Sequence, residues 1–217
     1  MTYTLETGPE DARLRLILAH GAGTGITSPF MDAVAANLAA HGVHVTRFEF
    51  GYMNARREGG AKRPPPKAEG LIPEYAALIA AVTAAAPKGQ KHFIGGKSMG
   101  GRVASMMADE AFGRVEIAGL VCLGYPFHAP SQSEKMRTAH LEKMTCPTLI
   151  VQGERDPFGN KTEIEAVKLS NAIQLKWIGD GDHDFGPRGA SGFTRKGNLN
   201  DAADAVAAFM TATAPSR

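Results

Sequence analysis

The stretch HFIGGKSMGGR, residues 92–102, contains two overlapping motifs that indicate different chemistries. GKS is how a phosphate-binding P-loop ends, whereas GKSMG fits the pattern G-x-S-x-G, in which an exposed serine attacks a carbonyl carbon. A P-loop also needs a glycine five residues before the glycine that precedes its lysine, and Lys91 occupies that position. Because the backbone cradle for phosphate is missing, Ser98 is the candidate for chemistry, as a nucleophile.

Ser98 needs two partners, because a serine hydroxyl is a poor nucleophile at neutral pH. A histidine must take its proton, and an acid must orient that histidine. Around a G-x-S-x-G serine the partners follow in chain order, the acid before the histidine. Three histidines follow Ser98, and we assign the role of base to His183 because its loop, GDGDHDF, comes directly after an apolar run. His128 and His140 stay as the alternatives.

Asp156 is the candidate acid, since PTLIVQGERDPFG places it three residues after the glycine that ends an apolar run. The three aspartates of the DGDHD loop are too close in sequence to its histidine to reach one ring nitrogen easily while the other faces the serine. Asp and Gly favour turns, and we expect that role for them. As a calcium loop, DGDHD lacks the twelve-residue pattern and the closing glutamate, so no metal site is expected.

Negative charge develops on the substrate oxygen during acyl transfer, and aimed N–H groups must stabilise it. The backbone N–H of Met99, the residue after the serine, is one expected donor. The second is expected from the loop AHGAGTG, residues 19–25, where we choose Ala22, with Gly23 as the alternate. The same glycines do not form a dinucleotide-binding fingerprint, since G-x-G-x-x-G fails at Ile26.

These loops can meet only if the surrounding elements bring them to one edge of a sheet. Apolar runs that predict strands alternate along the chain with stretches of helical periodicity. The expected strands are 14–21, 43–50, 91–96, 117–125, 147–153 and 173–179, and the expected helices are 28–42, 73–86, 100–113, 160–172 and 198–214. This alternation predicts a three-layer α/β/α sandwich with a mostly parallel, doubly wound sheet, whose reactive groups lie beyond the carboxyl ends of the strands.

One segment interrupts the alternation. MNARREGGAKRPPPKAEG, residues 53–70, is rich in Arg, Lys, Gly and Pro, and a long, partly extended loop is expected there. Its cations either attract anionic substrates to the mouth of the site or are ordinary solvated surface, and the second interpretation is the simpler one. The cations in question are Arg56, Arg57, Lys62 and Arg63.

Length and composition favour one domain over residues 1–217, since 217 residues with 43% hydrophobic side chains can bury one substantial core. A formal charge of +2 gives no reason to expect nucleic acid or an anionic membrane as a partner. We recognise no leader and no apolar stretch near the roughly 18 to 20 residues of a membrane span, and expect a cytoplasmic protein. Cys122 and Cys146 lack metal-ligand spacing and are expected to be buried thiols. Oligomeric state is not readable from the pattern.

Taken together, the motifs resemble the α/β-hydrolase superfamily along nearly the whole chain. The resemblance is greatest to its compact, dienelactone-hydrolase-related branch, in particular the Tex30-like and NSL-complex-subunit-like group. It rests on HGAG (20–23), GKSMGGR (96–102), LGYPFH (123–128), PTLIVQGERDPFG (147–159) and GDHDF (181–185). It implies an eight-stranded fold or a shortened version of it, and a triad of Ser98, Asp156 and His183. Dienelactone hydrolases proper use a cysteine nucleophile, so their lactone substrate does not carry over.

The expected activity is hydrolysis of small acyl esters or thioesters by a serine hydrolase that uses no cofactor. Only residues 126–146 separate two expected strands where related enzymes often insert a lid, so no large cap domain is expected. Without a lid, a shallow cleft for short acyl chains is expected, with aromatic walls formed by Phe30, Tyr125, Phe127 and Phe158. The alternative is a non-catalytic binding or scaffold protein on the same fold, because fold does not guarantee activity.

Overall fold

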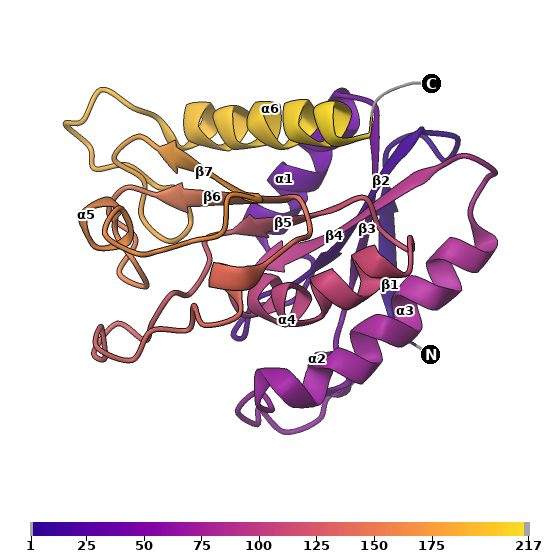
Figure 1. The fold of residues 1–217 in the computed structure, drawn as a ribbon. Helices are drawn as coiled ribbons and strands as arrows, with labels where there is room; N and C mark the ends of the chain where they lie inside the picture. The colour runs from indigo at the N-terminus through magenta and orange to yellow at the C-terminus, as the bar shows by residue number, and fades with distance from the viewer. Residues whose placement is uncertain (1, 215–217) are drawn as a thin grey trace.

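The computed structural model describes residues 2–214, which form a seven-stranded sheet with helices on both faces (Figure 1). The strands are β1 (Thr4–Thr7), β2 (Leu14–Ala19), β3 (Val43–Phe48), β4 (Lys91–Lys97), β5 (Gly119–Leu123), β6 (Thr148–Gly153) and β7 (Ile173–Ile178). The α-helices are α1 (Pro29–Ala40), α2 (Gly51–Arg57), α3 (Ile72–Ala85), α4 (Met99–Gly113), α5 (Lys161–Ile164) and α6 (Arg195–Thr213). Two short 3₁₀ turns are η1 (Ala68–Leu71) and η2 (Leu141–Lys143).

Strands β2 to β7 are parallel, as expected from their continuous apolar runs, and only β1 joins the sheet antiparallel, beside β3. Side chains of a strand alternate between the faces of the sheet, so β2 supplies two cores. Leu16 and Leu18 face one core, while Ile17 and Ala19 face the other. The expected three-layer sandwich is therefore present.

Helices α1 and α6 cover one face of the sheet, and α3 and α4 cover the other (Figure 1). Val34 of α1 and Val206 of α6 are both 1% exposed and pack in the first core, whereas Val103 of α4 is fully buried in the second. Burial of one such side chain contributes roughly 1.5 to 3 kcal/mol. This packing holds the strand ends, and the loops that follow them, in fixed positions.

The strand order β1-β3-β2-β4-β5-β6-β7 puts a topological switch at β2. The chain runs from β2 outward to β3 on one side, and returns to β4 on the other. Loops that follow β2 and β4 therefore leave the same edge of the sheet in opposite directions and open a crevice between them. Those loops contain the GAG stretch, 21–23, and Ser98.

The expectation of one long loop over residues 53–70 is wrong. Within 53–70, only 58–67 is an irregular loop, because α2 extends to Arg57 and η1 begins at Ala68. Met53 is buried, and Arg57 forms an ion pair with Glu49 at 3.0 Å, so tertiary contacts stabilise a helix that the basic composition concealed.

The expected helix at 160–172 ends at Ile164, after a single turn that begins with an Asn160 capping box. The Ser170 hydroxyl donates to the carbonyl oxygen of Met144 at 2.6 Å and the Ser170 N–H donates to that of Leu141 at 3.1 Å. These bonds hold the chain beside η2 in a non-helical conformation. Strand β1, with the polar sequence TLET, was not expected at all.

The stretch Ala68–Ala85 has the length and apolar composition of a membrane-spanning helix, with a mean hydropathy of 1.2. The expectation that no stretch comes near that length is therefore wrong. The large side chains Tyr75, Leu78 and Ile79 of this stretch are buried against the sheet. We accordingly describe α3 as an outer-layer helix of the sandwich.

Candidate active site

Ser98 occupies a sharp turn between β4 and α4, where its backbone has a φ of 52° and a ψ of −117°. Residues other than glycine, asparagine and aspartate rarely adopt positive φ, and such strain clusters at functional sites. The strain persists because β4 is held between β2 and β5 and α4 packs on the sheet directly after the turn. The turn presents the Ser98 side chain at the carboxyl edge of the sheet.

Both glycines of the G-x-S-x-G motif are required by close packing around this turn. A Cβ at Gly96 would lie 2.3 Å from the carbonyl carbon of Gly100, and one at Gly100 would lie 2.6 Å from the carbonyl oxygen of His20. Both distances are far below van der Waals contact. The motif therefore lets α4 start against β4 and against the loop that follows β2.

His183 and Asp156 meet at the ends of β7 and β6. His183 Nδ1 lies 2.8 Å from Asp156 Oδ2. An ionised carboxylate only accepts hydrogen bonds, so Nδ1 carries the proton and Nε2 is left as the acceptor. The Phe158 ring packs on the imidazole with a centroid separation of 4.3 Å. This is the arrangement that a general base needs, with one nitrogen oriented and the other open.

Asp156 is fully buried, and its carboxylate is satisfied by three donors. Besides His183, Gln152 Nε2 donates to Oδ2 at 3.0 Å and the Phe158 N–H donates to Oδ1 at 2.8 Å. The sequence-based reasoning missed Gln152, which is also fully buried and lies on β6, one residue before Gly153. A glutamine inside an otherwise apolar strand was the available signal.

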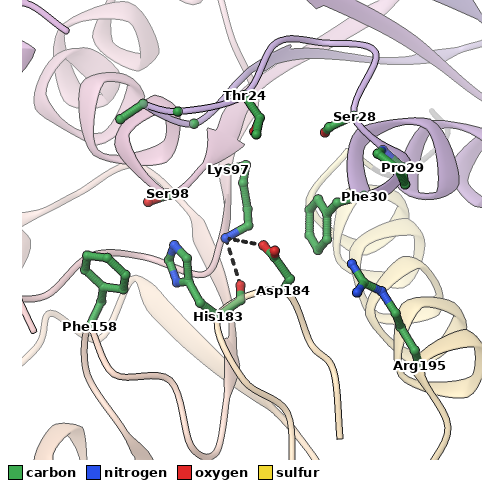
Figure 2. Close-up of a pocket in the computed structure, with 13 residues that line it drawn as sticks. Thr24, Ser28, Pro29, Phe30, Lys97, Ser98, Phe158, His183, Asp184 and Arg195 are labelled. Carbon is green, nitrogen blue, oxygen red and sulfur yellow. Dashed lines mark hydrogen bonds and ion pairs between the residues drawn. The ribbon is translucent and has the colours of Figure 1, made fainter. Parts of the chain in front are cut away.

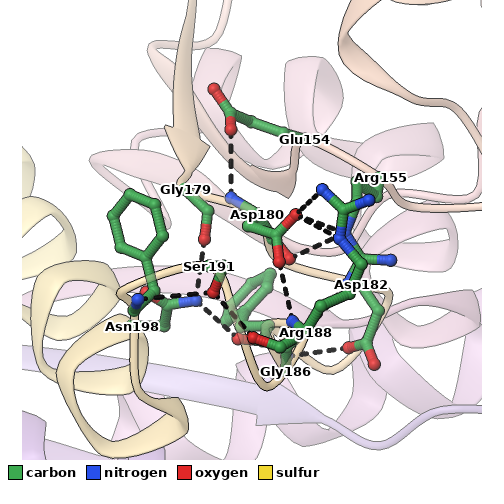
Figure 3. Close-up of polar contacts among 11 residues, drawn as sticks. Glu154, Arg155, Gly179, Asp180, Asp182, Gly186, Arg188, Ser191 and Asn198 are labelled. Carbon is green, nitrogen blue, oxygen red and sulfur yellow. Dashed lines mark hydrogen bonds and ion pairs between the residues drawn. The ribbon is translucent and has the colours of Figure 1, made fainter.

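The loop that carries His183 is fixed by a polar network (Figure 3). Asp180 pairs with Arg155 at 2.9 Å and also with Arg188, while its N–H donates to Glu154 at 3.0 Å. Asp182 Oδ1 accepts the N–H groups of Asp184 and Gly186, each at 2.8 Å. Asp182 therefore shapes a turn, as expected, whereas Asp180 and Asp184 form ion pairs, and Asp156 is the aspartate that reaches His183.

Ser98 and His183 line one cavity of about 640 Å³, and Figure 2 shows both side chains at its wall. No hydrogen bond joins the Ser98 hydroxyl to the His183 ring within residues 2–214. Catalytic hydrogen bonds are often loose without substrate and tighten in the complex. The other residues that line the cavity are Gly21, Ala22, Gly23, Thr24, Ser28, Pro29, Phe30, Lys97, Phe158, Asp184 and Arg195.

The loop after β2 turns its carbonyl groups toward side chains of the protein. In a trans peptide the carbonyl and the N–H that follows it point in opposite directions. The N–H group after each of these carbonyls therefore points away from those side chains. Ala22 and Gly23 line the cavity, and Met99 follows Ser98 as the first residue of α4. The three bonds are His20 Nδ1 to the Gly21 oxygen at 2.6 Å, Tyr52 to Ala22 at 3.1 Å and Arg56 to Gly23 at 3.3 Å.

His20 anchors this loop as a neutral ring. Its Nδ1–H donates to Gly21, and its Nε2 accepts the N–H of Phe50 at 3.2 Å. Burial lowers the pKa of His20 to about 4, against the hydrogen bond to Gly21, which raises it. A protonated ring would lose the bond from Phe50, because Nε2 would then carry a hydrogen.

Of the four aromatic residues expected in the cleft, the structure places Phe30 and Phe158 in the cavity wall and leaves out two. The assignment of Tyr125 and Phe127 to substrate binding is wrong, because both side chains are 0% exposed and pack in the core beneath α4. Gly124, with a φ of 62°, turns the chain directly after β5, just before these two residues.

The two alternative histidines lie outside this cavity. His128 is buried, with Nδ1 2.9 Å from the carbonyl oxygen of Ala129 and Nε2 3.4 Å from Glu163. His140 lies 2.8 Å from the Ser105 hydroxyl, beside α4. Both are held by structural contacts rather than placed beside Ser98.

Cys122 and Cys146 are buried free thiols. Residues 2–214 contain no cluster of three or more His, Cys, Asp or Glu side chains arranged to hold a metal ion. Sequence reasoning also missed the cavity cations Lys97 and Arg195. Lys97 is the variable residue of the serine motif, and Arg195 starts α6, so no recognised pattern pointed to either.

Comparison with known proteins agrees with this architecture. A family model described as an alpha/beta hydrolase domain matches residues 12–211. Est1E from Butyrivibrio proteoclasticus, solved with ferulic acid bound, superposes with a TM-score of 0.69 at 17% identity, over 98% of this chain and 95% of the other. Dienelactone hydrolase from Anabaena variabilis gives 0.69 at 20% identity, over 98% and 97%. XC6422 from Xanthomonas campestris, described as an a/b serine hydrolase without lid, gives 0.67 at 16%, over 99% and 90%.

Proposed function

This chain belongs to the alpha/beta hydrolase domain family, and we propose that within this family it is a serine hydrolase that transfers acyl groups to water. The observation that carries the proposal is the pairing of His183 with buried Asp156 at 2.8 Å, on the cavity that Ser98 lines from a strained strand-to-helix turn. Chain order and geometry agree with the roles of nucleophile, base and orienting acid.

In the proposed reaction, Ser98 Oγ attacks the substrate carbonyl carbon while its proton passes to His183 Nε2. The N–H groups of Met99 and Ala22, or Gly23, stabilise the negative oxygen of the tetrahedral intermediate. Collapse of that intermediate expels an alcohol or thiol, which takes the proton from Nε2 and leaves an acyl-serine. Water then attacks the acyl group and gives a proton to His183 Nε2. The second tetrahedral intermediate collapses, Ser98 Oγ leaves and takes that proton back, and the carboxylic acid is released.

We propose small carboxylic esters or thioesters as substrates. Phe30 and Phe158 supply apolar walls beside Ser98, and residues 124–147 between β5 and β6 contain only η2 as regular structure. The motifs GKSMGGR and GDHDF support placement of the chain in the compact, Tex30-like and NSL-complex-subunit-like branch, with a cytoplasmic site of action. A binding or scaffold role on the same fold is the competing proposal, since that branch includes a chromatin-complex subunit.

A fluorophosphonate probe distinguishes the two proposals, because it reacts only with a serine whose hydroxyl is activated. We expect stoichiometric labelling of the peptide that contains Ser98, loss of labelling in Ser98→Ala, and unchanged labelling in Ser28→Ala. Ser28 is a matched control because it lines the same cavity but lies outside the strained turn. A folded wild-type protein that stays unlabelled would refute the hydrolase and favour the scaffold.

A further inference from the structure

Lys97, the residue between Gly96 and the nucleophile, is 6% exposed and reaches the loop of the catalytic base. Its ammonium donates to the carbonyl oxygen of His183 at 2.8 Å and forms an ion pair with Asp184 Oδ1 at 3.2 Å (Figure 2). Lys97 thus holds the segment 183–184 directly. Residues 86 positions apart in the chain are joined here by one side chain.

The chain provides specific room for this contact at Gly124, where φ is 62°. A Cβ at this position would lie 3.1 Å from Lys97 Nζ and 3.2 Å from His183 Nδ1. The ammonium and the imidazole therefore both lie against Gly124, within a few ångströms of each other. Charges at such separations interact appreciably, since the Lys97 side chain is shielded from water.

A buried ammonium is unfavourable unless it is paired. Burial lowers the pKa of Lys97, and the nearby carboxylate of Asp184 opposes this effect most strongly. The Phe30 ring lies 5.3 Å from the ammonium and closes its remaining side. A lysine kept in so buried a position, beside the nucleophile, requires an explanation beyond surface solubility.

We propose that Lys97 is a positioning residue for His183, an inference that rests on the proposed hydrolase function. Its hydrogen bond fixes the backbone from which the imidazole projects, so that Nε2 faces Ser98 while Nδ1 stays on Asp156. Its charge also disfavours a second positive charge on the ring. Asp184 has the opposite electrostatic effect, because it neutralises that ammonium.

Several other charged groups lie near the His183 ring, so the effect of Lys97 must be separated from theirs. The cationic neighbours are Lys97 from β4 and Arg195 at the start of α6, which line the same cavity. The anionic neighbours are Asp156, from the loop after β6, and Asp182 and Asp184, from the same loop as His183.

The test compares Lys97→Met, Asp184→Asn and the control Lys176→Met with the wild type in ester hydrolysis. Lys97→Met keeps the length of the side chain without the donor or the charge, and we expect kcat to fall about 10- to 100-fold with KM changed less than about threefold. The acid limb of its kcat/KM profile should move to higher pH by about 0.5 to 1 unit, and that of Asp184→Asn to lower pH. Lys176 of β7 pairs with Asp201 of α6 at 2.7 Å, away from the cavity, and the Lys176→Met variant should behave as wild type.

A second measurement makes the test independent of turnover. The pH titration of the His183 ring, followed by NMR and assigned with His183→Gln, should show the same opposite displacements in the two variants. If the ring titrations move as expected but the wild type hydrolyses no ester, the hydrolase proposal fails alone. If Lys97→Met is folded and active with an unmoved acid limb and ring titration, the role of Lys97 is overturned. Should Lys97→Met not fold, an unmoved titration in Asp184→Asn overturns it equally.

Discussion

Asp156 is a fully buried carboxylate, and its two oxygens receive hydrogen bonds from His183, Gln152 and the Phe158 N–H. Its position is therefore set by the protein rather than by solvent, and its negative charge is what holds the imidazole proton on Nδ1. An asparagine would fit the same space but offers an amide oxygen and an amide group in place of a carboxylate. The residue thus acts through the tautomer and orientation of His183.

We expect Asp156→Asn to keep the fold and to lower kcat on the order of 10⁴-fold, the effect seen where a comparable orienting acid is replaced. KM should change little, because Asp156 is buried behind the ring. Steady-state kinetics on a p-nitrophenyl ester, with circular dichroism for the fold, checks this.

The matched control is Asp182→Asn. Asp182 Oδ1 accepts two backbone N–H groups, and an amide oxygen can accept the same bonds. Its turnover should stay near that of the wild type. An inactive Asp182→Asn beside a near-normal Asp156→Asn would show that the acid was assigned to the wrong residue.

At the scale of elements, the loop after β2 depends on a buried neutral histidine. The unfolded chain binds a proton on His20 below about pH 6.5, whereas the folded protein binds it only near pH 4. Between these values the unfolded state holds more protons, so falling pH favours unfolding. His20 thus contributes stability that is complete above about pH 6.5 and decreases as the pH falls toward 4.

We expect this decrease to reach about 3 kcal/mol in the free energy of unfolding, because folding lowers the pKa of His20 from 6.5 to about 4. Urea denaturation of the wild type and of His20→Gln between pH 7.5 and 4.5 gives the free energy of unfolding at each pH. The contribution of His20 is the difference between the two proteins in the slope of this free energy against pH. His92 and His140, whose pKa values are also lowered by burial, act in the same direction in both proteins. Equal slopes would show that His20 is not held neutral.

At the scale of the whole molecule, no cap covers the cavity in the described chain, and its wall beside Ser98 is formed by Phe30 and Phe158. A long acyl chain gains roughly 0.8 kcal/mol for each methylene that it buries, and this gain stops where the wall ends. Binding energy that is not realised in the transition state adds nothing to the rate.

We therefore expect kcat/KM for p-nitrophenyl esters to peak at acyl chains of about two to six carbons and to flatten or fall beyond. The series from acetate to palmitate tests this directly. A steady rise to the longest chain would contradict the open cavity and would indicate that the loop at 58–67 closes over the acyl group. Replacement of that loop by a short Gly/Ser linker should then abolish the rise.

The amino-acid sequence by itself determined the alternation of strands and helices. Hydrophobic periodicity is a local property, and the strands β2 to β7 lie almost entirely within the apolar runs of the sequence. It also selected Ser98, Asp156 and His183 for the site, since each follows an apolar run and parallel strands end at one edge of the sheet. Only the tertiary structure showed that Tyr125 and Phe127 turn into the core, that α2 lies within a basic segment, and that Lys97 reaches His183. Those features depend on the direction in which a chain leaves a strand and on contacts between distant segments, and neither is encoded in the local pattern of residues.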